Sequence, residues 1–433
     1  MNVLITGASG FIGSHITDAL IQQGHHVSVC VRNRELAQLR WPDARIVTAD
    51  FSKDHTISDW LSRLDNVDVV INAVGIIRES GSQRFKDLHT DSPCDLFKAC
   101  EQAGVNRVIQ ISALGADDTA FSQYHLSKRA ADECLMGLAL NWSILLPSIV
   151  YGPGAKSMAF FRALAALPFT PILAKGDQQL QPIHIDDVVR AVLQIIHSAE
   201  QNRFRIELVG PEAITIKQIY SRLRHWLGLG SPRYISIPYP LMLIAGYLAG
   251  LLGDSPMTRE SIQMLRRGNT ADVAPFVNRF GFVPQSLEQS LKNSPAQQAD
   301  RWYAGLYFLK PLLRLSIGCL WIFTGIVSAF VFPLEQSYAM LEKAGVTGFW
   351  GPVMLYGAAA TNFALGLATL MAYHLQFIGL IQVALIALYT IIITFSQPEL
   401  WVHPFGPISK NIPLIIATLI MLVLEHNNGL RNA

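Results

Sequence analysis

Two kinds of apolar pattern divide the chain. Over the first 150 residues, short β-branched and aliphatic runs alternate with longer stretches of helical period, which is typical of βαβ units in a parallel sheet. Six runs are predicted to be strands: Val3–Ile5, Val27–Val31, Arg45–Thr48, Val67–Asn72, Arg107–Ile111 and Trp142–Leu146. This pattern predicts an α/β fold with a doubly wound parallel sheet over residues 1–150.

Residues 151–300 are expected to form a small substrate lobe appended to that sheet domain, because the alternation loosens and prolines separate shorter elements. One segment of this lobe, Pro238–Leu252, carries no charge until Asp254 and is too short to cross a membrane comfortably. It is either a buried helix of the lobe or a helix whose apolar face lies on a bilayer near the substrate entrance.

Long uncharged stretches follow Asp300 and predict an all-α transmembrane domain over residues 311–424. Three stretches have 18, 24 and 21 residues without a charge, close to the ~20 that cross a hydrocarbon core: Leu315–Phe332, Trp350–Tyr373 and Leu375–Phe395. Ile412–Leu424 is shorter. We expect a four-helix bundle at about 315–332, 350–373, 375–395 and 411–424, because small residues that allow close helix packing crowd the second stretch.

The charges beside these stretches predict an orientation. Arg301, Lys310 and Arg314 precede the first span and Arg431 follows the last, and positive residues favour the cytoplasmic side. The chain is therefore expected to be a multi-pass protein of the cell (inner) membrane, with the sheet domain and both termini in the cytoplasm. No basic region followed by a short apolar stretch opens the sequence, so no secretory peptide is expected.

Composition narrows the classes of partner. Charged residues make up 15% of the chain, against about 25% in soluble proteins, and residues 311–433 hold only eight of them. With a net charge of +2 and no basic run, nucleic acid is not expected. Five scattered cysteines without a CxxC pair predict neither disulfides nor a zinc site. No metal is expected at His184, Asp186 and Asp187 either, because consecutive helical residues point about 100° apart.

The strongest chemical signal is the segment TGASGFIG, which follows the first predicted strand and opens a helix. Glycines at this spacing make a tight turn, let the backbone approach a pyrophosphate and let the helix pack on the strand, while the helix N-terminus offers N–H groups to phosphates. The sequence therefore predicts dinucleotide binding by Gly7, Ser9, Gly10, Phe11, Ile12 and Gly13.

The end of the second strand bears on the choice of cofactor. A site that prefers NAD places Asp or Glu there, whereas this chain has Val31-Arg32-Asn33-Arg34. A guanidinium suits a 2′-phosphate because it offers a rigid fork of donors. NADP(H) is therefore the preferred cofactor and NAD(H) a possible one, with Arg32 and Arg34 as binding residues. The alternative is that both arginines belong to a solvated loop.

Further segments follow in a fixed order: Asp50-Phe51, Asn72-Ala73-Val74-Gly75, Ile111 to Ala116, Tyr124-His125-Leu126-Ser127-Lys128, Pro147 to Pro153 and Pro182 to Val188. Across roughly residues 1–290 the chain resembles the short-chain dehydrogenase/reductase superfamily in its extended or atypical branch, and within it the group of the SDR-like accessory subunit of respiratory complex I. The membrane portion resembles a DoxX-like domain. The resemblance implies a Rossmann domain whose further cofactor-binding positions are Asp50, Phe51, Asn72, Ala73, Val74, Gly75, Lys128 and Pro147.

The same resemblance implies a catalytic group. Tyr124 and Lys128 are four residues apart and share one face of a helix; Tyr124 would be the acid/base, while Lys128 would lower the tyrosine pKa and hold the nicotinamide ribose. Ser112 would hydrogen-bond the reacting carbonyl. The next residue is Ala113, and Leu146 replaces an arginine that extended members commonly carry. These departures favour nucleotide binding without turnover.

Three hypotheses follow. The leading one is a membrane-anchored, NADP(H)-dependent SDR-type oxidoreductase or epimerase for a lipophilic carbonyl, hydroxyl or quinone-like small molecule, with the lipid bilayer and a membrane protein as partners. The alternative is a non-catalytic NADP(H)-binding assembly or redox-sensing protein of a membrane complex. In a third, the bundle is the functional unit, in quinone-linked electron transfer, and the sheet domain regulates it.

Overall fold

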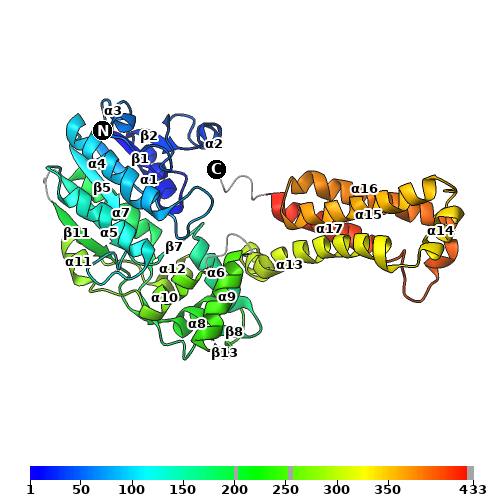
Figure 1. Ribbon diagram of the computed structural model, residues 1–433. Helices are drawn as coiled ribbons and strands as arrows, with labels where there is room; N and C mark the ends of the chain where they lie inside the picture. The colour runs from blue at the N-terminus through cyan, green and yellow to red at the C-terminus, as the bar shows by residue number, and fades with distance from the viewer. Residues whose placement is uncertain (199–202, 252–256, 427–433) are drawn as a thin grey trace. The chain divides into compact units, whose positions relative to one another are not determined.

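The computed structural model describes residues 1–198, 203–251 and 257–426 (Figure 1). Its contacts divide the chain into two units, Met1–Gly305 and a second one that begins at Leu306. Arg431 and Leu252, which the sequence predictions use, lie outside the described residues.

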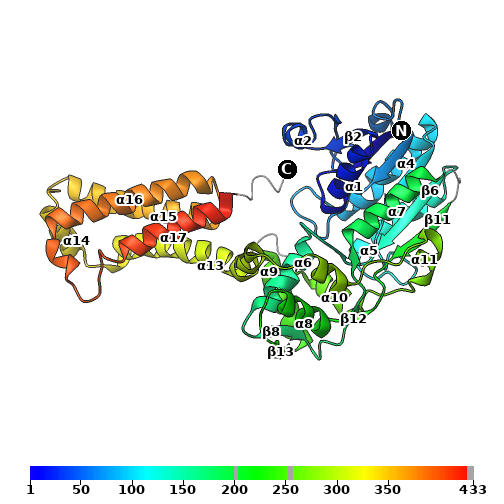
Figure 2. The same ribbon diagram turned by 180° about the vertical axis from the view of Figure 1, so that it is seen from behind.

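A seven-stranded parallel sheet forms the centre of the first unit, in the order β3-β2-β1-β4-β5-β6-β11. The strands are β1 (Asn2–Thr6), β2 (His26–Val31), β3 (Arg45–Thr48), β4 (Val69–Asn72), β5 (Arg107–Ile111), β6 (Trp142–Pro147) and β11 (Phe204–Leu208). Helices cover both faces (Figures 1 and 2), which explains why strands such as β1, β4 and β6 are mostly apolar rather than alternating. The predicted doubly wound fold is confirmed.

Two apolar layers enclose this sheet. One face packs against α1 (Phe11–Gln22), α2 (Arg34–Arg40), α7 (Ile185–His197) and α11 (Ala274–Phe280). The other face packs against α3 (Ile57–Leu61), the π-helical turn η1 (Lys86–Asp91), α4 (Ser92–Ala103) and α5 (Gln123–Met136). The six predicted strands are present, and β11 is a seventh that the sequence interpretation missed. The chain returns to the sheet after residue 150 through Val188, Ile206 and Phe276, which share one core cluster.

The small lobe of the first unit is built from short paired strands and five helices. The strands are β7 (Val150–Tyr151) with β10 (Ile183–His184), β8 (Thr170–Leu173) with β13 (Tyr234–Ile237), and β9 (Gln179–Leu180) with β12 (Ile214–Thr215). The helices are α6 (Lys156–Ala166), α8 (Ile216–Trp226), α9 (Tyr239–Leu251), α10 (Arg259–Arg267) and α12 (Leu287–Asn293). Phe161, Tyr220 and Leu223 lie in its core.

Helix α9 decides between the two interpretations of the apolar segment Pro238–Leu252. Leu241, Ile244 and Tyr247 are 57%, 56% and 64% exposed. The interpretation of α9 as a buried helix is therefore wrong at these three residues.

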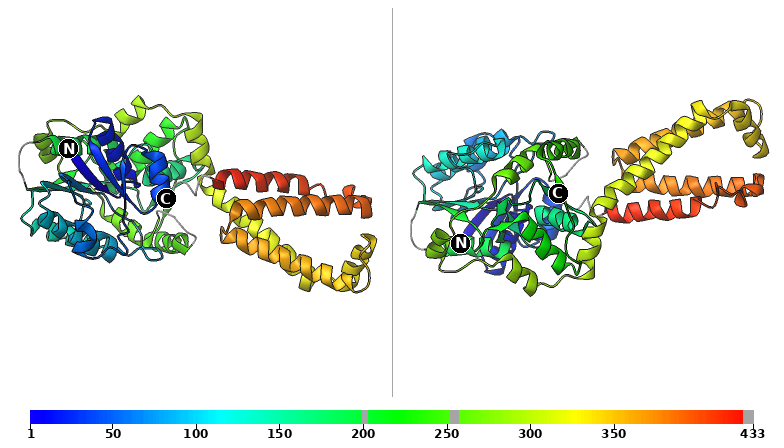
Figure 3. Two further views of the ribbon diagram at one scale, coloured as in Figure 1. Left: turned by 90° about the horizontal axis from the view of Figure 1, so that it is seen from above. Right: turned by 90° about the horizontal axis from the view of Figure 1, so that it is seen from below.

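The second unit is helical, as predicted (Figure 3). Its elements are α13 (Gln298–Ile326), which starts in the first unit, the π-turn η2 (Val327–Val331), α14 (Leu334–Lys343), α15 (Trp350–Leu370), α16 (Leu375–Ser396), the 3-10 turn η3 (Pro398–Trp401) and α17 (Asn411–His426). Among the residues that the structure describes, three segments are long and apolar enough to cross a membrane: Gln298–Val331, α15 and α16. Helix α17 is apolar but shorter, so a fourth crossing stays a prediction.

Small residues bring the helices of this unit together. A Cβ at Gly366 of α15 would lie 2.6 Å from the carbonyl oxygen of Gly318 of α13, a close approach that packing in a membrane favours. Glu425 at the end of α17 pairs with Lys310 and Arg314 in the middle of α13, at 3.2 and 3.4 Å. The end of α17 therefore lies beside the middle of α13, just before the predicted span Leu315–Phe332.

Candidate functional site

The glycine turn after β1 lies where the strand order reverses, between β1 and β4, the place where parallel sheets bind ligands. Gly7 has φ +67°, and a Cβ there would lie 2.6 Å from the carbonyl carbon of Ala73. A Cβ at Gly13 would overlap the carbonyl oxygen of Gly7. The N–H of Gly10 closes the turn by donating to that oxygen at 2.9 Å. Only glycine fits these positions, so α1 starts directly against the strand ends.

The start of α1 fits a dinucleotide phosphate. Ser9 and Gly10 are exposed, and Gly10 caps the helix without a side chain that would occupy its N–H groups. The first turn of a helix has N–H groups without helical partners and a positive dipole end. Phe11 and Ile12 are half-buried, and Phe11 packs against the apolar core of the small lobe. Phe11 and Ile12 are therefore predicted to bind the phosphates through their backbone N–H groups. The Phe11 ring is held by the small-lobe core.

Arg32 and Arg34 are exposed at the end of β2 and the start of α2. The guanidinium of Arg32 faces the side-chain amide of Gln83, whose oxygen accepts a hydrogen bond when the amide is turned toward it. Asn33 between the arginines caps α2 by accepting the N–H of Leu36 at 3.2 Å. Arg32 is thus partly oriented, whereas Arg34 is an exposed helix residue.

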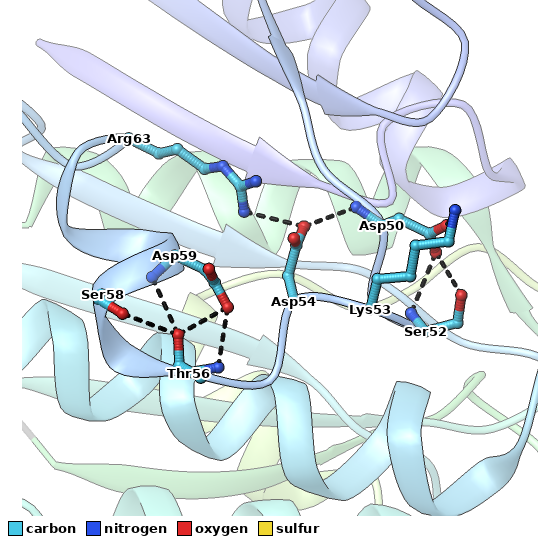
Figure 4. Close-up of polar contacts among 8 residues, drawn as sticks. All are labelled: Asp50, Ser52, Lys53, Asp54, Thr56, Ser58, Asp59 and Arg63. Carbon is cyan, nitrogen blue, oxygen red and sulfur yellow. Dashed lines mark hydrogen bonds and ion pairs between the residues drawn. The ribbon is translucent and has the colours of Figure 1, made fainter.

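Asp50 is held by a local hydrogen-bond network after β3 (Figure 4). Its carboxylate accepts from the N–H and the hydroxyl of Ser52 at 3.0 and 2.7 Å, and its own N–H donates to Asp54. Burial raises the pKa of Asp50, but the Ser52 bonds and the charges of Lys53 and Arg32 outweigh it, so the pKa lies below its ordinary value. Phe51 is buried. Asp50 therefore stays an ionised acceptor at this edge.

Asn72 links three strands at their carboxyl ends. It is buried, accepts from the hydroxyl of Thr6 at 2.7 Å and donates to Gln110 at 2.8 Å. Its side-chain oxygen also accepts the N–H of Val74 at 3.3 Å. These bonds fix the turn Asn72 to Gly75 beside the glycine turn of β1, since Ala73 is the residue against which Gly7 packs.

Lys128 extends from α5 into the sheet edge. Its ammonium donates to the carbonyls of Val74 at 2.8 Å and of Ile111 at 3.1 Å, which leaves the third of its three N–H groups for a ligand. A Cβ at Gly75 would lie 3.2 Å from this nitrogen, so glycine keeps the space around it. Lys128 is 3% exposed, and burial lowers its pKa to about 8.

Tyr124 lies one turn before Lys128 and is half-buried. Its ring packs edge-on against His89 and Phe85, with centroids 5.5 and 6.1 Å away. Its backbone N–H donates to Glu260 of α10 at 2.9 Å. Burial raises its pKa to about 12, and the charges of Glu260 and Asp132 act in the same direction. The shift is opposite to the predicted lowering, because burial and the nearby carboxylates favour the neutral phenol.

In the described part of the chain, the hydrogen bonds of Ser112 are made inside the domain. Its hydroxyl donates to the carboxylate of Asp132 at 2.5 Å, and its N–H donates to Leu145 of β6 at 2.8 Å. Ala113, beside it, is also buried. Pro147 ends β6, where its carbonyl accepts the N–H of Leu114. The structure brings Ser112 together with Asp132 and leaves its catalytic role a prediction.

Two known families match separate parts of the chain. Residues 3–207 match the NAD dependent epimerase/dehydratase family, and residues 318–419 match the DoxX-like family. The chain thus has an epimerase/dehydratase-like NAD-binding domain followed by a DoxX-like domain. The resemblance to an SDR-type domain followed by a DoxX-like domain is therefore confirmed.

Relatives of the epimerase/dehydratase-like domain include both a reductase and a subunit of a respiratory complex. The chain is 29% identical to a ceramide reductase of Caulobacter vibrioides, over 57% of this chain and 76% of that protein. It is 26% identical to NADH dehydrogenase [ubiquinone] 1 alpha subcomplex subunit 9 of Arabidopsis thaliana mitochondria, over 55% of this chain and 60% of that protein. The match thus spans about three fifths of the plant subunit.

Solved structures share the fold of this domain. A nucleoside-diphosphate-sugar epimerase of Staphylococcus aureus has a TM-score of 0.57 and 21% identity, over 67% of this chain and 100% of that one. The UDP-glucuronic acid 4-epimerase of Bacillus cereus, in complex with UDP-glucuronic acid and NAD, has a TM-score of 0.52 and 20% identity, over 70% of this chain and 99% of that one.

Three residues of the epimerase/dehydratase domain that surround Tyr124 and Lys128 were missed in the sequence. His89 accepts the N–H of Ile76 at 2.9 Å and lies 2.9 Å from the hydroxyl of Ser127. Burial and the charge of Lys128 lower its pKa to about 2, so it is neutral. Asp132 is one turn beyond Lys128, a spacing that could have indicated it. His89 and Glu260 belong to distant elements, and no local pattern indicates them.

Proposed function

We propose that this protein is a membrane-anchored oxidoreductase that reduces a carbonyl group of a lipophilic substrate with NADP(H). The observation that carries the proposal is the buried Lys128 with Tyr124 one turn before it, at the edge of a nucleotide-binding sheet, in a chain that also has membrane-length helices. Neither feature alone points to a lipophilic substrate, but together they do.

In this mechanism the glycine turn binds the pyrophosphate and Lys128 offers its third N–H to the nicotinamide ribose. The nicotinamide, when bound, supplies the hydride. Tyr124 donates a proton from its hydroxyl to the substrate oxygen. Burial and nearby carboxylates raise the pKa of Tyr124 to about 12, so the phenol is protonated at neutral pH and has a proton to donate. His89 holds α5 in place, since its ring nitrogen lies 2.9 Å from the Ser127 hydroxyl. Within the helix, that hydroxyl donates to the carbonyl of Tyr124 at 2.9 Å.

The substrate class rests on three observations. The helices of the DoxX-like domain are apolar enough to cross a membrane, and an apolar groove of about 580 Å³ lies between α13 and α17, lined mainly by leucines. The Caulobacter relative is named a ceramide reductase. We therefore place a long-chain lipid carbonyl first among the lipophilic candidates, ahead of isoprenoid and quinone-like ones.

The preference for NADP(H) is part of the proposal. Exposed Arg32 and Arg34 and the missing acid after β2 support it. The Bacillus cereus structure holds NAD, so NAD(H) is the competing cofactor.

We also propose that the protein is a multi-pass protein of the inner membrane, with the sheet domain and both termini in the cytoplasm. The ion pairs of Glu425 with Lys310 and Arg314 support an even number of crossings, because they bring the end of α17 back to the residues that directly precede the predicted first span. Reporter fusions at Ala433 and in the 335–348 loop test it. We expect Ala433 to be cytoplasmic and the loop external; an external Ala433 would mean that α17 does not cross.

The activity is tested on the full chain purified in detergent. We expect NADPH to copurify or bind, and its oxidation to depend on a carbonyl substrate from a panel of long-chain lipid ketones, isoprenoid carbonyls and quinones. Binding of nucleotide without oxidation of NADPH by any member of the panel would argue against the enzyme.

A second candidate is a non-catalytic NADP(H)-binding protein of a membrane complex, with a membrane protein as its partner. The bond of Ser112 to Asp132 favours it, because this hydroxyl is already used inside the domain. The similarity to a complex I subunit supports it as well. This candidate predicts that nucleotide binding matters in cells while the hydroxyl of Tyr124 does not.

A further inference from the structure

Helix α9 exposes an apolar face that the fold does not cover. The helix has no charged residue along Tyr239–Leu251, and Leu241, Ile244 and Tyr247 are each more than half exposed. Their spacing places them on one side of the helix. Ile235, on the strand that leads into α9, is 48% exposed. Apolar residues exposed together on one element, rather than singly, are a feature of interaction surfaces.

The opposite side of α9 is fixed to α10. A Cβ at Gly246 would lie 2.5 Å from the side chain of Ile262 and 3.2 Å from the backbone of Thr258, so the two helices are in close contact at this glycine. The position of α9 is therefore set by packing on α10, and its apolar face is held outward.

We propose that α9 lies in the interface of a lipid bilayer, with Leu241, Ile244 and Tyr247 in the hydrocarbon boundary. An uncharged helix of 13 residues is too short to cross but long enough to lie in the interface plane.

Charge near the helix favours a lipid surface as the occupant. Arg259 and Arg266 of α10 are exposed, and the backbone of Arg259 lies against Gly246. The guanidinium of Arg266 stacks over the ring of Tyr239 at 4.6 Å, at the first residue of α9. Basic residues beside an apolar helix attract anionic lipid headgroups.

The chain itself keeps this lobe near a membrane. Helix α13, which carries the first candidate span, begins on the small lobe, where Asp300 pairs with Arg162 of α6 at 3.0 Å. Fifteen residues separate Asp300 from Leu315, about 22 Å of helix. A tether this short raises the effective concentration of α9 at the bilayer surface.

This contact would connect the bilayer with the catalytic group. Helix α10, on which α9 packs, also carries Glu260, whose carboxylate accepts the N–H of Tyr124 at 2.9 Å. We infer that a lipophilic substrate enters from the bilayer along α9 toward Tyr124. This entry route rests on the proposed function, whereas the contact of α9 with lipid does not.

The contact is tested on the full chain in nanodiscs that contain anionic lipid. A spin-labelled amino acid is incorporated at Ile244 and, as the matched control, at Leu39, an apolar residue of α2 that is 79% exposed. Oxygen partitions into the bilayer and a nickel chelate stays in water. We expect the ratio of oxygen to nickel accessibility to be several-fold higher at Ile244 than at Leu39.

If something other than lipid covers the exposed face of α9, the accessibilities differ from those expected, and the proposal is overturned. Equal ratios at Ile244 and Leu39 would mean a free surface. Low accessibility to both reagents at Ile244 would mean a protein partner, and dipolar broadening between labels would mean a second copy of this chain.

A variant separates the contact from the entry route. Leu241→Glu with Ile244→Glu places charges on the exposed face, where folding is not at stake, and Leu39→Glu is its control. We expect a several-fold higher KM for a bilayer-embedded carbonyl and an unchanged KM for a short water-soluble one. An unchanged KM for both overturns the entry route. If neither is turned over by the unmodified chain, the proposed function fails while the accessibility result still stands.

Discussion

The turn after β1 and the inner face of α5 meet at one edge of the sheet, yet they are built in different ways. Seven residues and their backbone make the turn, and three glycines are there because any Cβ would meet main-chain atoms. The face of α5 is completed by groups from other elements: the carbonyl of Val74, the imidazole of His89 and the carboxylate of Glu260. Nucleotide binding is thus a local property, whereas the chemistry depends on tertiary contacts.

The two regions also differ in electrostatics. The start of α1 is exposed and its N–H groups belong to the backbone, so its polarity is permanent. On α5, Lys128 and Asp132 are buried, and desolvation shifts their pKa values toward the neutral forms, to about 8 and about 6. Changes at the turn should therefore abolish binding, and changes on α5 should alter rate, stability and pH dependence.

The largest effect is expected at the turn. Gly13→Val places a side chain where the carbonyl of Gly7 lies, so the start of α1 must move off the strand and dinucleotide binding should be lost. Gly230→Val is the control, because it is exposed and no atom lies within 4 Å of its Cβ position. Titration calorimetry measures both. Binding by Gly13→Val that equals the unmodified chain would show that the phosphates do not bind at this turn.

On α5 we expect separable effects. Tyr124→Phe should leave nucleotide affinity nearly intact and lower turnover by about 10²–10⁴, as loss of a general acid does. Lys128→Ala should damage both, because its ammonium also ties α5 to Val74 and Ile111. Single-turnover kinetics and calorimetry on each variant decide it. A fall in thermal stability of Tyr124→Phe with unchanged turnover per folded molecule would make Tyr124 a packing residue.

A smaller effect is expected on the preference between NADP(H) and NAD(H), which Arg32 beside the turn is predicted to set. Arg32→Asp should weaken NADP(H) by about 10- to 100-fold, the factor that one charged hydrogen bond supplies, and should reverse or abolish the preference over NAD(H). Calorimetry with both cofactors measures the ratio, and Arg40→Asp, an exposed arginine at the other end of α2, is the control. Stronger binding of NAD(H) by the unmodified chain would contradict the preference.

Local pattern was sufficient for the sheet and the turn. β1 to β6 each contain a short stretch of aliphatic or β-branched residues and are separated by stretches of helical period, so their positions along the chain and a parallel sheet could be predicted. β11 was missed because Phe-Arg-Ile-Glu-Leu alternates like an exposed strand and follows the elements of the small lobe. The same limit applies to α9, since an apolar run of 13 residues has the same pattern whether it is buried in a core or faces outward.

The chemical half of the site was only partly predictable, for a physical reason. Tyr124 and Lys128 share a helix, so their spacing gives their relation. The pKa of Tyr124 depends on burial and on Glu260, which is 136 residues away. The direction of Ser112 depends on which acceptor α5 presents to it. Properties set by such contacts require the tertiary structure.

The smallest effect is expected at Ser112. It tests whether this hydroxyl stabilises the fold through a tertiary contact or serves a substrate. Ser112→Ala removes a hydrogen bond to buried Asp132, so we expect a loss of about 1.5–3 kcal/mol of stability where Asp132 is ionised and about 0.5–1.5 kcal/mol where it is neutral. The folded-state pKa of Asp132 is raised from 3.8 to about 6, mainly by burial. Its contribution to stability is therefore fully present below about pH 3.8 and is lost as the pH rises through 6. The deficit of Ser112→Ala in thermal unfolding should accordingly be larger at pH 8 than at pH 5, with exposed Ser58→Ala as the control. If Ser112 instead turns toward a substrate, stability will be unchanged at both pH values and turnover alone will fall.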